Sequence, residues 1–317
     1  MRALFQRNAR LWLGVLLSGL ISGCTSLGIT PRLSPPPDDI PRRVELDKTP
    51  FFPQEQNHCG PAALATLLQH LQIPATPESL GRLTYLPGLE GSLQIELAAT
   101  ARQHGVLVYP LSGKLNHLLR EVAAGNPVLI LQNQAFNWYP RWHYAVVVGY
   151  DLEQELLILR SGRERRWITG FATFMNTWNR GGNWAIVTLP PSQLPATATS
   201  SVYLSAANDL EQTGQHAAAH RAYQTAVEAW PENSTAWLAL GNSAYSGGDW
   251  SLAVQTFRRA TELQPLNTTA WNNLAYALLA DGQKSQALAA LQRALTLSPE
   301  DTNLLDSQRE ILQQLGN

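Results

Sequence analysis

The two side chains in this sequence with the clearest potential for chemistry are a cysteine and a histidine, Cys59 and His143. Cys59 opens the stretch CGPAALATLLQHL, whose apolar residues follow helical spacing and whose Pro61 suits a first helical turn. A thiol at a helix N-terminus is stabilised as thiolate by the helix dipole, so we expect a lowered pKa and a nucleophilic sulfur. His143 begins the apolar strand HYAVVVGY, where its imidazole can reach a cleft and accept the thiol proton.

The other histidines have weaker claims to the role of base. His58 adjoins the cysteine, but neighbouring side chains diverge at a helix start. His70 and His104 lie near helix ends, and His117 lies in a polar stretch. His216 and His220 belong to a separate region of repeats. We therefore expect His143 to be the base.

Two further groups complete the candidate site. The side-chain amide of Gln54, with the Cys59 backbone N–H, would form an oxyanion hole for acyl transfer; Gln56 is the alternative donor. No carboxylate stands in the strand LLILRS that follows His143. A hairpin turn near Glu153 puts the position across from His143 between Arg160 and Arg163, so Ser161 is best placed to orient the imidazole, with a backbone carbonyl as the alternative.

The elements expected around these residues are helices first and strands later. Helices are predicted over 60–71 and 92–105, and strands over 127–133, 143–150, 156–161 and 183–189. This order indicates an α+β domain rather than a doubly wound sheet.

The N-terminus has the layout of a bacterial signal peptide. Arg2, Arg7 and Arg10 precede an apolar run, and Ile21 to Cys24 resembles a lipobox, after which residues 1–23 would be removed and Cys24 would carry lipid. An ordinary secretory signal is the alternative. Thr25 after the cysteine favours the outer membrane, with the protein facing the periplasm. A lipidated Cys24 leaves Cys59 without a partner for an internal disulfide.

The remaining chain divides by composition. A proline-rich tether without regular structure is expected over 24–50, the α+β domain over 51–190 and a linker over 191–200. From 201 to 317 the chain repeats every 34 residues, with units that begin near Ser200, Ser234 and Thr268 and a last helix over 302–315. These units resemble three tetratricopeptide repeats with a capping helix, which implies a groove for a partner protein. A spacer without a ligand is the alternative.

Composition argues against other classes of function. A net charge of -1 gives no electrostatic case for nucleic acid, and the scattered cysteines and histidines lack metal-ligand spacing. We therefore expect no cofactor and no metal.

The stretch FFPQEQNHCGPAALATLL with the later HYAVVVGYD resembles the papain-like cysteine peptidases of the double-glycine leader peptidase family, in particular their lipoprotein relatives with tetratricopeptide repeats. The resemblance covers roughly residues 50 to 190. It implies Cys59 as nucleophile, His143 as base, Gln54 as oxyanion donor and a peptide or protein as substrate. The family pattern places an Asp, usually followed by Pro, where this chain has Ser161.

The expected fold is an α+β papain-like cysteine peptidase domain followed by an all-α tetratricopeptide-repeat solenoid. The missing aspartate leaves two alternatives to a peptidase. One is an inactive papain-like scaffold that acts through protein binding, and the other is an acyl transferase of the transglutaminase type.

Overall fold

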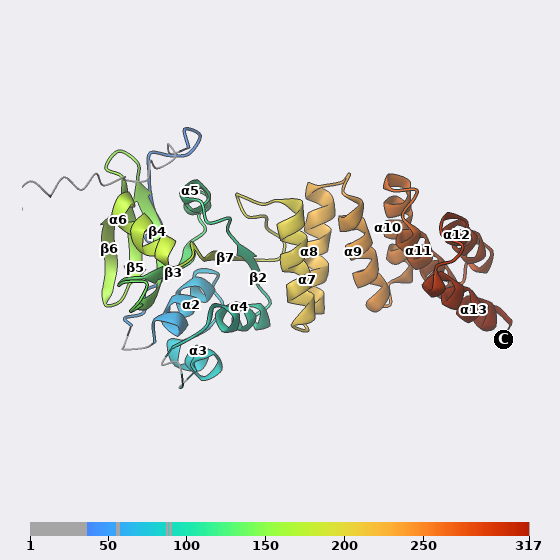
Figure 1. The fold of residues 1–317 in the computed structure, drawn as a ribbon, viewed down its shortest axis with the longest axis horizontal. Coiled ribbons are helices and arrows are strands. Elements are labelled where there is room, and N and C mark those ends of the chain that lie inside the picture. Colours follow the sequence, from blue (N-terminus) through green and yellow to red (C-terminus); the bar gives the residue numbers. More distant parts are fainter. Residues whose placement is uncertain (1–36, 55–57, 87, 89–90, 317) are drawn as a thin grey trace, which may run out of the picture. The chain divides into compact units, whose positions relative to one another are not determined.

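The computed structural model describes residues 37–54, 58–86, 88 and 91–316 (Figure 1). The signal peptide, Cys24 and Gln56 lie outside the described residues. Within the described ranges, no helix is both long and apolar enough to cross a membrane.

The N-terminal domain is an antiparallel sheet with helices packed on it. Its strands are β1 (Arg43–Glu45), β2 (Leu107–Pro110), β3 (Val128–Asn133), β4 (Trp142–Asp151), β5 (Leu156–Ser161), β6 (Glu164–Gly170) and β7 (Ala185–Leu189). Among the described residues they form one sheet in the order β2-β7-β3-β4-β5-β6, with β1 paired to β4. Its helices are α2 (Cys59–His70), α3 (Pro77–Thr84), α4 (Gln94–Gln103), α5 (Leu115–Ala123) and α6 (Phe171–Arg180).

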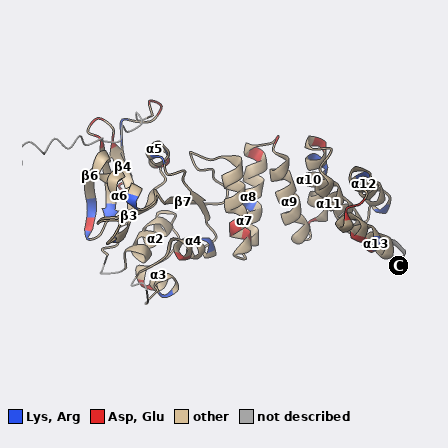
Figure 2. Ribbon diagram, viewed as in Figure 1, with Lys and Arg blue, Asp and Glu red and all other residues tan. Residues whose placement is uncertain are grey.

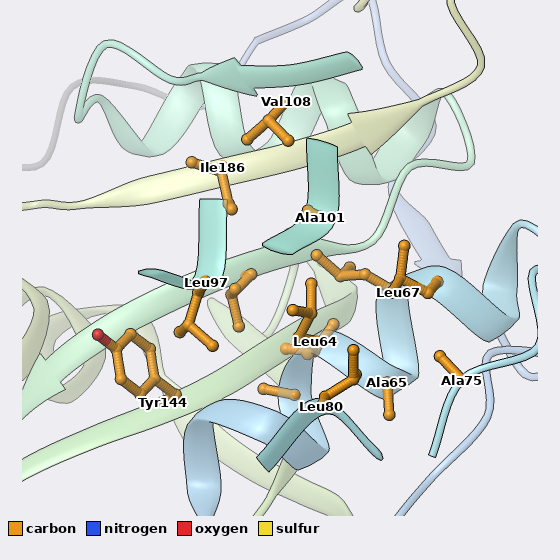
Figure 3. Packing of buried hydrophobic residues seen from close by; sticks show 14 of the residues in the cluster. Leu64, Ala65, Leu67, Ala75, Leu80, Leu97, Ala101, Val108, Tyr144 and Ile186 are labelled. Carbon is orange, nitrogen blue, oxygen red and sulfur yellow. The ribbon is translucent and has the colours of Figure 1, made fainter. Parts of the chain in front are cut away.

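The core of this domain forms where α2 crosses the centre of the sheet. Leu64 and Leu67 of α2 are fully buried in one cluster with Tyr144 and Val146 of β4 and Ile186 of β7 (Figure 3). Burial of each such leucine contributes about 1.5–3 kcal/mol. The packing therefore anchors the start of α2, and with it Cys59, against the strand that begins beside His143.

Each predicted helix and strand of this domain is present, with its ends within two residues of the expected positions. The expectation that residues 24–50 hold no regular structure is wrong over Arg43–Glu45, which form β1. The reason lies in β4: β3 pairs only with Trp142 to Val147, and β1 pairs on from Gly149 to Asp151. The short strand satisfies backbone groups of a buried strand that would otherwise lack partners.

The C-terminal half consists of paired helices. They are α7 (Ser200–Gln212), α8 (His216–Ala229), α9 (Ser234–Ser246), α10 (Trp250–Leu263), α11 (Thr268–Ala280), α12 (Lys284–Leu297) and α13 (Thr302–Gly316). Three of them begin at Ser200, Ser234 and Thr268, where the repeat predicts each unit to start. The predicted fold class, an α+β domain followed by helical repeats, is confirmed.

The segment between the two halves is held by a buried carboxylate. Glu121 of α5 is fully buried and accepts hydrogen bonds from the backbone N–H groups of Ala196 and Thr197, at 3.1 and 2.8 Å. It also accepts the Thr197 hydroxyl at 2.6 Å and the Asn126 amide at 2.8 Å. This residue therefore fixes the path of the chain from the sheet towards α7.

Candidate active site

Cys59 is the first residue of α2 and is partly buried. The following Gly60 lets the helix start approach Ser92 closely, since a Cβ at Gly60 would lie 3.0 Å from the Ser92 side chain. His58, which precedes the sulfur, packs its ring against Tyr85 with centroids 5.4 Å apart. The aromatic neighbour of the His58 ring is therefore Tyr85.

The expected lowering of the Cys59 pKa is wrong. Burial raises the pKa of this thiol, and this effect exceeds the opposing effect of the backbone N–H groups of Tyr144, Gly60 and Cys59 itself. The helix start supplies the N–H donors that the sequence predicts, but the surrounding core removes water from the sulfur. The thiol is consequently favoured in its neutral form before substrate binds.

His143 lies on β4, with Gln132 of β3 as its cross-strand neighbour. Its Nε2 lies 2.9 Å from the Ser161 hydroxyl at the end of β5, which leaves Nδ1 for another partner. Burial, with a smaller effect of the Arg141 charge, lowers the pKa of His143 to about 4. The imidazole is thus neutral at physiological pH, and the structure pairs it with a hydroxyl.

The Cys59 sulfur lies beside the segment of β4 that carries the imidazole. The backbone N–H of Tyr144, the residue after His143, donates towards the Cys59 sulfur. The Tyr144 phenol donates to the carbonyl of Ser92 at 3.1 Å and so braces this contact. The arrangement places a neutral thiol and a neutral imidazole in the lining of one cavity.

Gln54 is buried, with 9% of its surface exposed, and is held by the turn between β5 and β6. The N–H of Gly162 donates to Gln54 Oε1 at 3.0 Å, and the Gly162 carbonyl accepts the Gln54 backbone N–H at 2.9 Å. Its side-chain nitrogen donates weakly to the Tyr144 carbonyl at 3.4 Å. The amide has a second N–H, which can donate to an oxyanion.

These groups meet around one cavity of about 1190 Å³. Gln54, Cys59 and His143 all line it. Ser161 lines a smaller adjoining cavity of about 450 Å³ together with His143 and Glu164. The structure thus brings together the four residues singled out in this domain, whose catalytic roles stay predictions.

Sequence reasoning did not place several of the groups that surround this cavity. Gly162 holds Gln54, and Arg141, Arg163 and Arg180 line the cavity. A glycine after Ser161 was a visible signal for a tight turn, and its φ is +60°. Nothing in the sequence pattern placed Arg180, at the end of α6, in the lining of the cavity that contains Cys59.

Two of the other histidines described in this domain have hydrogen-bond partners away from the sulfur. His70 contacts the Thr49 hydroxyl at 3.2 Å and the Gly125 carbonyl at 3.1 Å, and burial lowers its pKa. His117 contacts the Ser112 hydroxyl at 3.0 Å. In the part of the chain that the structure describes, no three His, Cys, Asp or Glu residues gather as a metal site would require.

In a comparison with known proteins, a family model matches each half of the chain. Residues 46–186 match the Peptidase_C39 like family, and residues 204–265 and 238–302 match the Tetratricopeptide repeat. No curated protein matches the chain. The chain therefore carries a peptidase C39-like domain followed by tetratricopeptide repeats.

Solved structures resemble each half separately. A putative C39-like peptidase from Bacillus anthracis is 20% identical, with a TM-score of 0.40, over 47% of this chain and 98% of that chain. The first tetratricopeptide domain of the human RPAP3 protein is 20% identical, with a TM-score of 0.35, over 37% of this chain and 92% of that chain. The tetratricopeptide domain of Arabidopsis OM64 is 18% identical, with a TM-score of 0.34, over 36% of this chain and 94% of that chain.

Proposed function

We propose that this protein is a cysteine peptidase that cleaves a peptide or protein through an acyl-enzyme on Cys59. The observation that carries the proposal is the meeting of Cys59, His143 and Gln54 around one cavity, with Ser161 hydrogen-bonded to the imidazole. A thiol nucleophile, a base and an amide donor are the groups that acyl transfer requires.

In the proposed reaction, His143 acts first as a base and then as an acid with the same proton. His143 takes the Cys59 proton as the sulfur attacks the substrate carbonyl carbon, and the oxyanion accepts hydrogen bonds from Gln54 and the Cys59 N–H. The tetrahedral intermediate then collapses, the peptide C–N bond breaks and His143 returns the proton to the leaving amine. Water, activated by His143, hydrolyses the thioester and regenerates the thiol. Since Nε2 faces Ser161, proton transfer runs through Nδ1.

Thiol labelling tests the pair. We expect an electrophilic peptide probe to label the wild type at Cys59 and to label His143→Ala at least tenfold more slowly, because the base contributes this much or more to acyl transfer. His117→Ala, outside the cavity, is the matched control and should label as the wild type does. Equal labelling of the wild type and His143→Ala would refute the pair.

A second candidate function is a non-catalytic scaffold. The observation that favours it is the partner of the imidazole: among the described residues, no carboxylate hydrogen-bonds to His143. A hydroxyl fixes the ring but stabilises imidazolium less than a carboxylate does. If Cys59→Ser complements a deletion strain fully, the scaffold function holds and the peptidase function fails.

We further propose that this protein is an outer-membrane lipoprotein anchored through lipid on Cys24. Its repeats would recruit a partner or substrate protein. The lipobox-like sequence before Cys24 and the repeat match support this proposal. Metabolic labelling with an alkyne fatty acid should tag the wild type and not Cys24→Ser, and fractionation of the envelope should place the tagged protein. A wild type without label would refute the anchor.

A further inference from the structure

We propose that the cavity around Cys59 selects substrates with a carboxylate next to the cleaved bond, held by Arg141, Arg163 and Arg180. This inference rests on the proposed peptidase function, since it names the substrate class of the same site. It follows from the charges that line the cavity.

The charged side chains that line this cavity are of one sign. Arg141, Arg163 and Arg180 contribute three guanidinium groups, and no described residue of the lining is Asp or Glu. The carboxylate of Glu164 lines the smaller adjoining cavity. Figure 2 shows basic residues next to an acidic one on β6, and further basic residues beside α6.

These arginines are not neutralised within the described part of the chain. Arg141 donates to the Gln134 side-chain carbonyl at 2.8 Å, and Arg180 donates to the Asn133 backbone carbonyl at 3.2 Å. Both acceptors are uncharged, and none of the ion pairs between described residues includes Arg141, Arg163 or Arg180. Like charges around one cavity repel each other, so an anionic ligand relieves the repulsion.

Two of the arginines also lie close in the chain to residues of the candidate site. Arg141 precedes His143 by two residues, and its charge contributes to the lowered pKa of that imidazole. Arg163 follows Gly162, which hydrogen-bonds Gln54. A substrate whose scissile carbonyl lies between Cys59 and Gln54 therefore places its neighbouring side chains within reach of guanidinium groups. Planar guanidinium groups bind carboxylates through paired hydrogen bonds, which gives selectivity over an amide of the same shape.

Alkylation of Cys59 measures this selectivity without any need for cleavage. Iodoacetate carries a carboxylate, and iodoacetamide is its neutral counterpart. Both react with the same thiolate, so the ratio of the iodoacetate rate to the iodoacetamide rate at Cys59 does not depend on the thiolate fraction. The same ratio for glutathione is the reference. We expect a ratio above that of glutathione, a decrease of about threefold to tenfold in Arg163→Gln, and an intermediate ratio in Arg163→Lys, which keeps the charge but not the paired hydrogen bonds. Arg221→Gln, in the repeats, is the matched control. Equal ratios in the wild type and Arg163→Gln would overturn the proposal.

Peptide cleavage identifies the source of the carboxylate. Peptide pairs that differ by Glu or Gln beside the cleaved bond, all amidated at the C-terminus, test a side-chain carboxylate, and the Gln peptides with a free C-terminus test a terminal one. A preference for either carboxylate that falls in Arg163→Gln supports the proposal, and no preference overturns it. Selective alkylation without cleavage of any peptide would refute the peptidase function and leave the carboxylate selectivity standing.

Discussion

The hydroxyl that contacts His143 gives the sharpest test of the site. Ser161→Asp puts a carboxylate next to Nε2, which lies 2.9 Å from the Ser161 hydroxyl in the wild type. An anion at this position stabilises imidazolium and therefore raises the pKa of His143 from about 4. The same change favours transfer of the Cys59 proton to His143, which converts the neutral pair into thiolate and imidazolium.

The magnitude follows from the separation. An opposite charge within 4–6 Å moves a pKa by about 1–3 units, and desolvation of the new carboxylate reduces the gain. A rise of about 2 units corresponds to about 2.7 kcal/mol and increases the population of the ion pair by a factor of about 100. We therefore expect Cys59 in Ser161→Asp to react with iodoacetamide about 10 to 100 times faster at pH 7 than in the wild type.

The assay is the pH dependence of alkylation, followed by mass spectrometry of the Cys59 peptide. Ser161→Asn is the matched control, because it has the shape of aspartate without the charge. Ser161→Ala, which removes the hydroxyl, should slow the reaction, with a loss of about 1 kcal/mol for one neutral hydrogen bond. Identical profiles for Ser161→Asp and Ser161→Asn, with both variants folded, would refute the predicted effect of charge at this position on the ionisation of His143.

Three further predictions concern stability, each measured by denaturant unfolding of the full chain. Acidification from about pH 6.5 to 4 should destabilise the native state by about 3 kcal/mol through His143, because the unfolded imidazole binds its proton at 6.5 and the folded one only at about 4. His143→Gln should reduce this loss, and parallel curves would contradict it. Gly241→Ala should cost about 1–3 kcal/mol, because the new Cβ would lie 2.4 Å from the Phe257 ring. Adding Phe257→Leu, the residue type at the equivalent position of the next repeat, should recover most of that loss, and no recovery would exclude the clash as its cause. Glu121→Gln should lower the free energy of unfolding by about 2–4 kcal/mol and expose residues 190–199 to proteolysis. The glutamine amide would place an N–H group against the backbone N–H of Ala196 or Thr197, which now donates to a carboxylate oxygen. Glu153→Gln, at an exposed site, is the control, and equal proteolysis of both variants would contradict a role for the Glu121 carboxylate.

The predictable part of the fold is the part with strong periodicity. The strands around His143 are runs of branched aliphatic residues, and the helix after Cys59 has a continuous apolar face. The repeats carry small residues and an aromatic residue at matching positions of each unit, so their helix starts were also predictable. β1 was not, because a three-residue strand has no period and forms only where β4 leaves a row of backbone groups open.

The candidate site likewise has a part that could be predicted from the sequence and a part that could not. Residue types and the order of elements indicated Cys59, His143 and Gln54. The ionisation of the thiol depends on how completely the core removes water from the sulfur, and a helix start read from sequence contains no measure of that. The arginines of the cavity come from separate elements, so only the three-dimensional fold places them together.

The Ser161–Gly162 pair, where the family resemblance implies Asp–Pro, acts on two catalytic candidates at once. Ser161 contacts the base, while the N–H and carbonyl of Gly162 bind Gln54 from a backbone with φ of +60°. Proline has no N–H and its ring fixes φ near −65°, so it cannot make this contact. An Asp–Pro pair placed here would supply the imidazole with a charge and release Gln54 in the same step. This is why Ser161→Asp alone isolates the effect of the carboxylate: it changes the partner of the base and leaves the turn that holds the oxyanion donor intact.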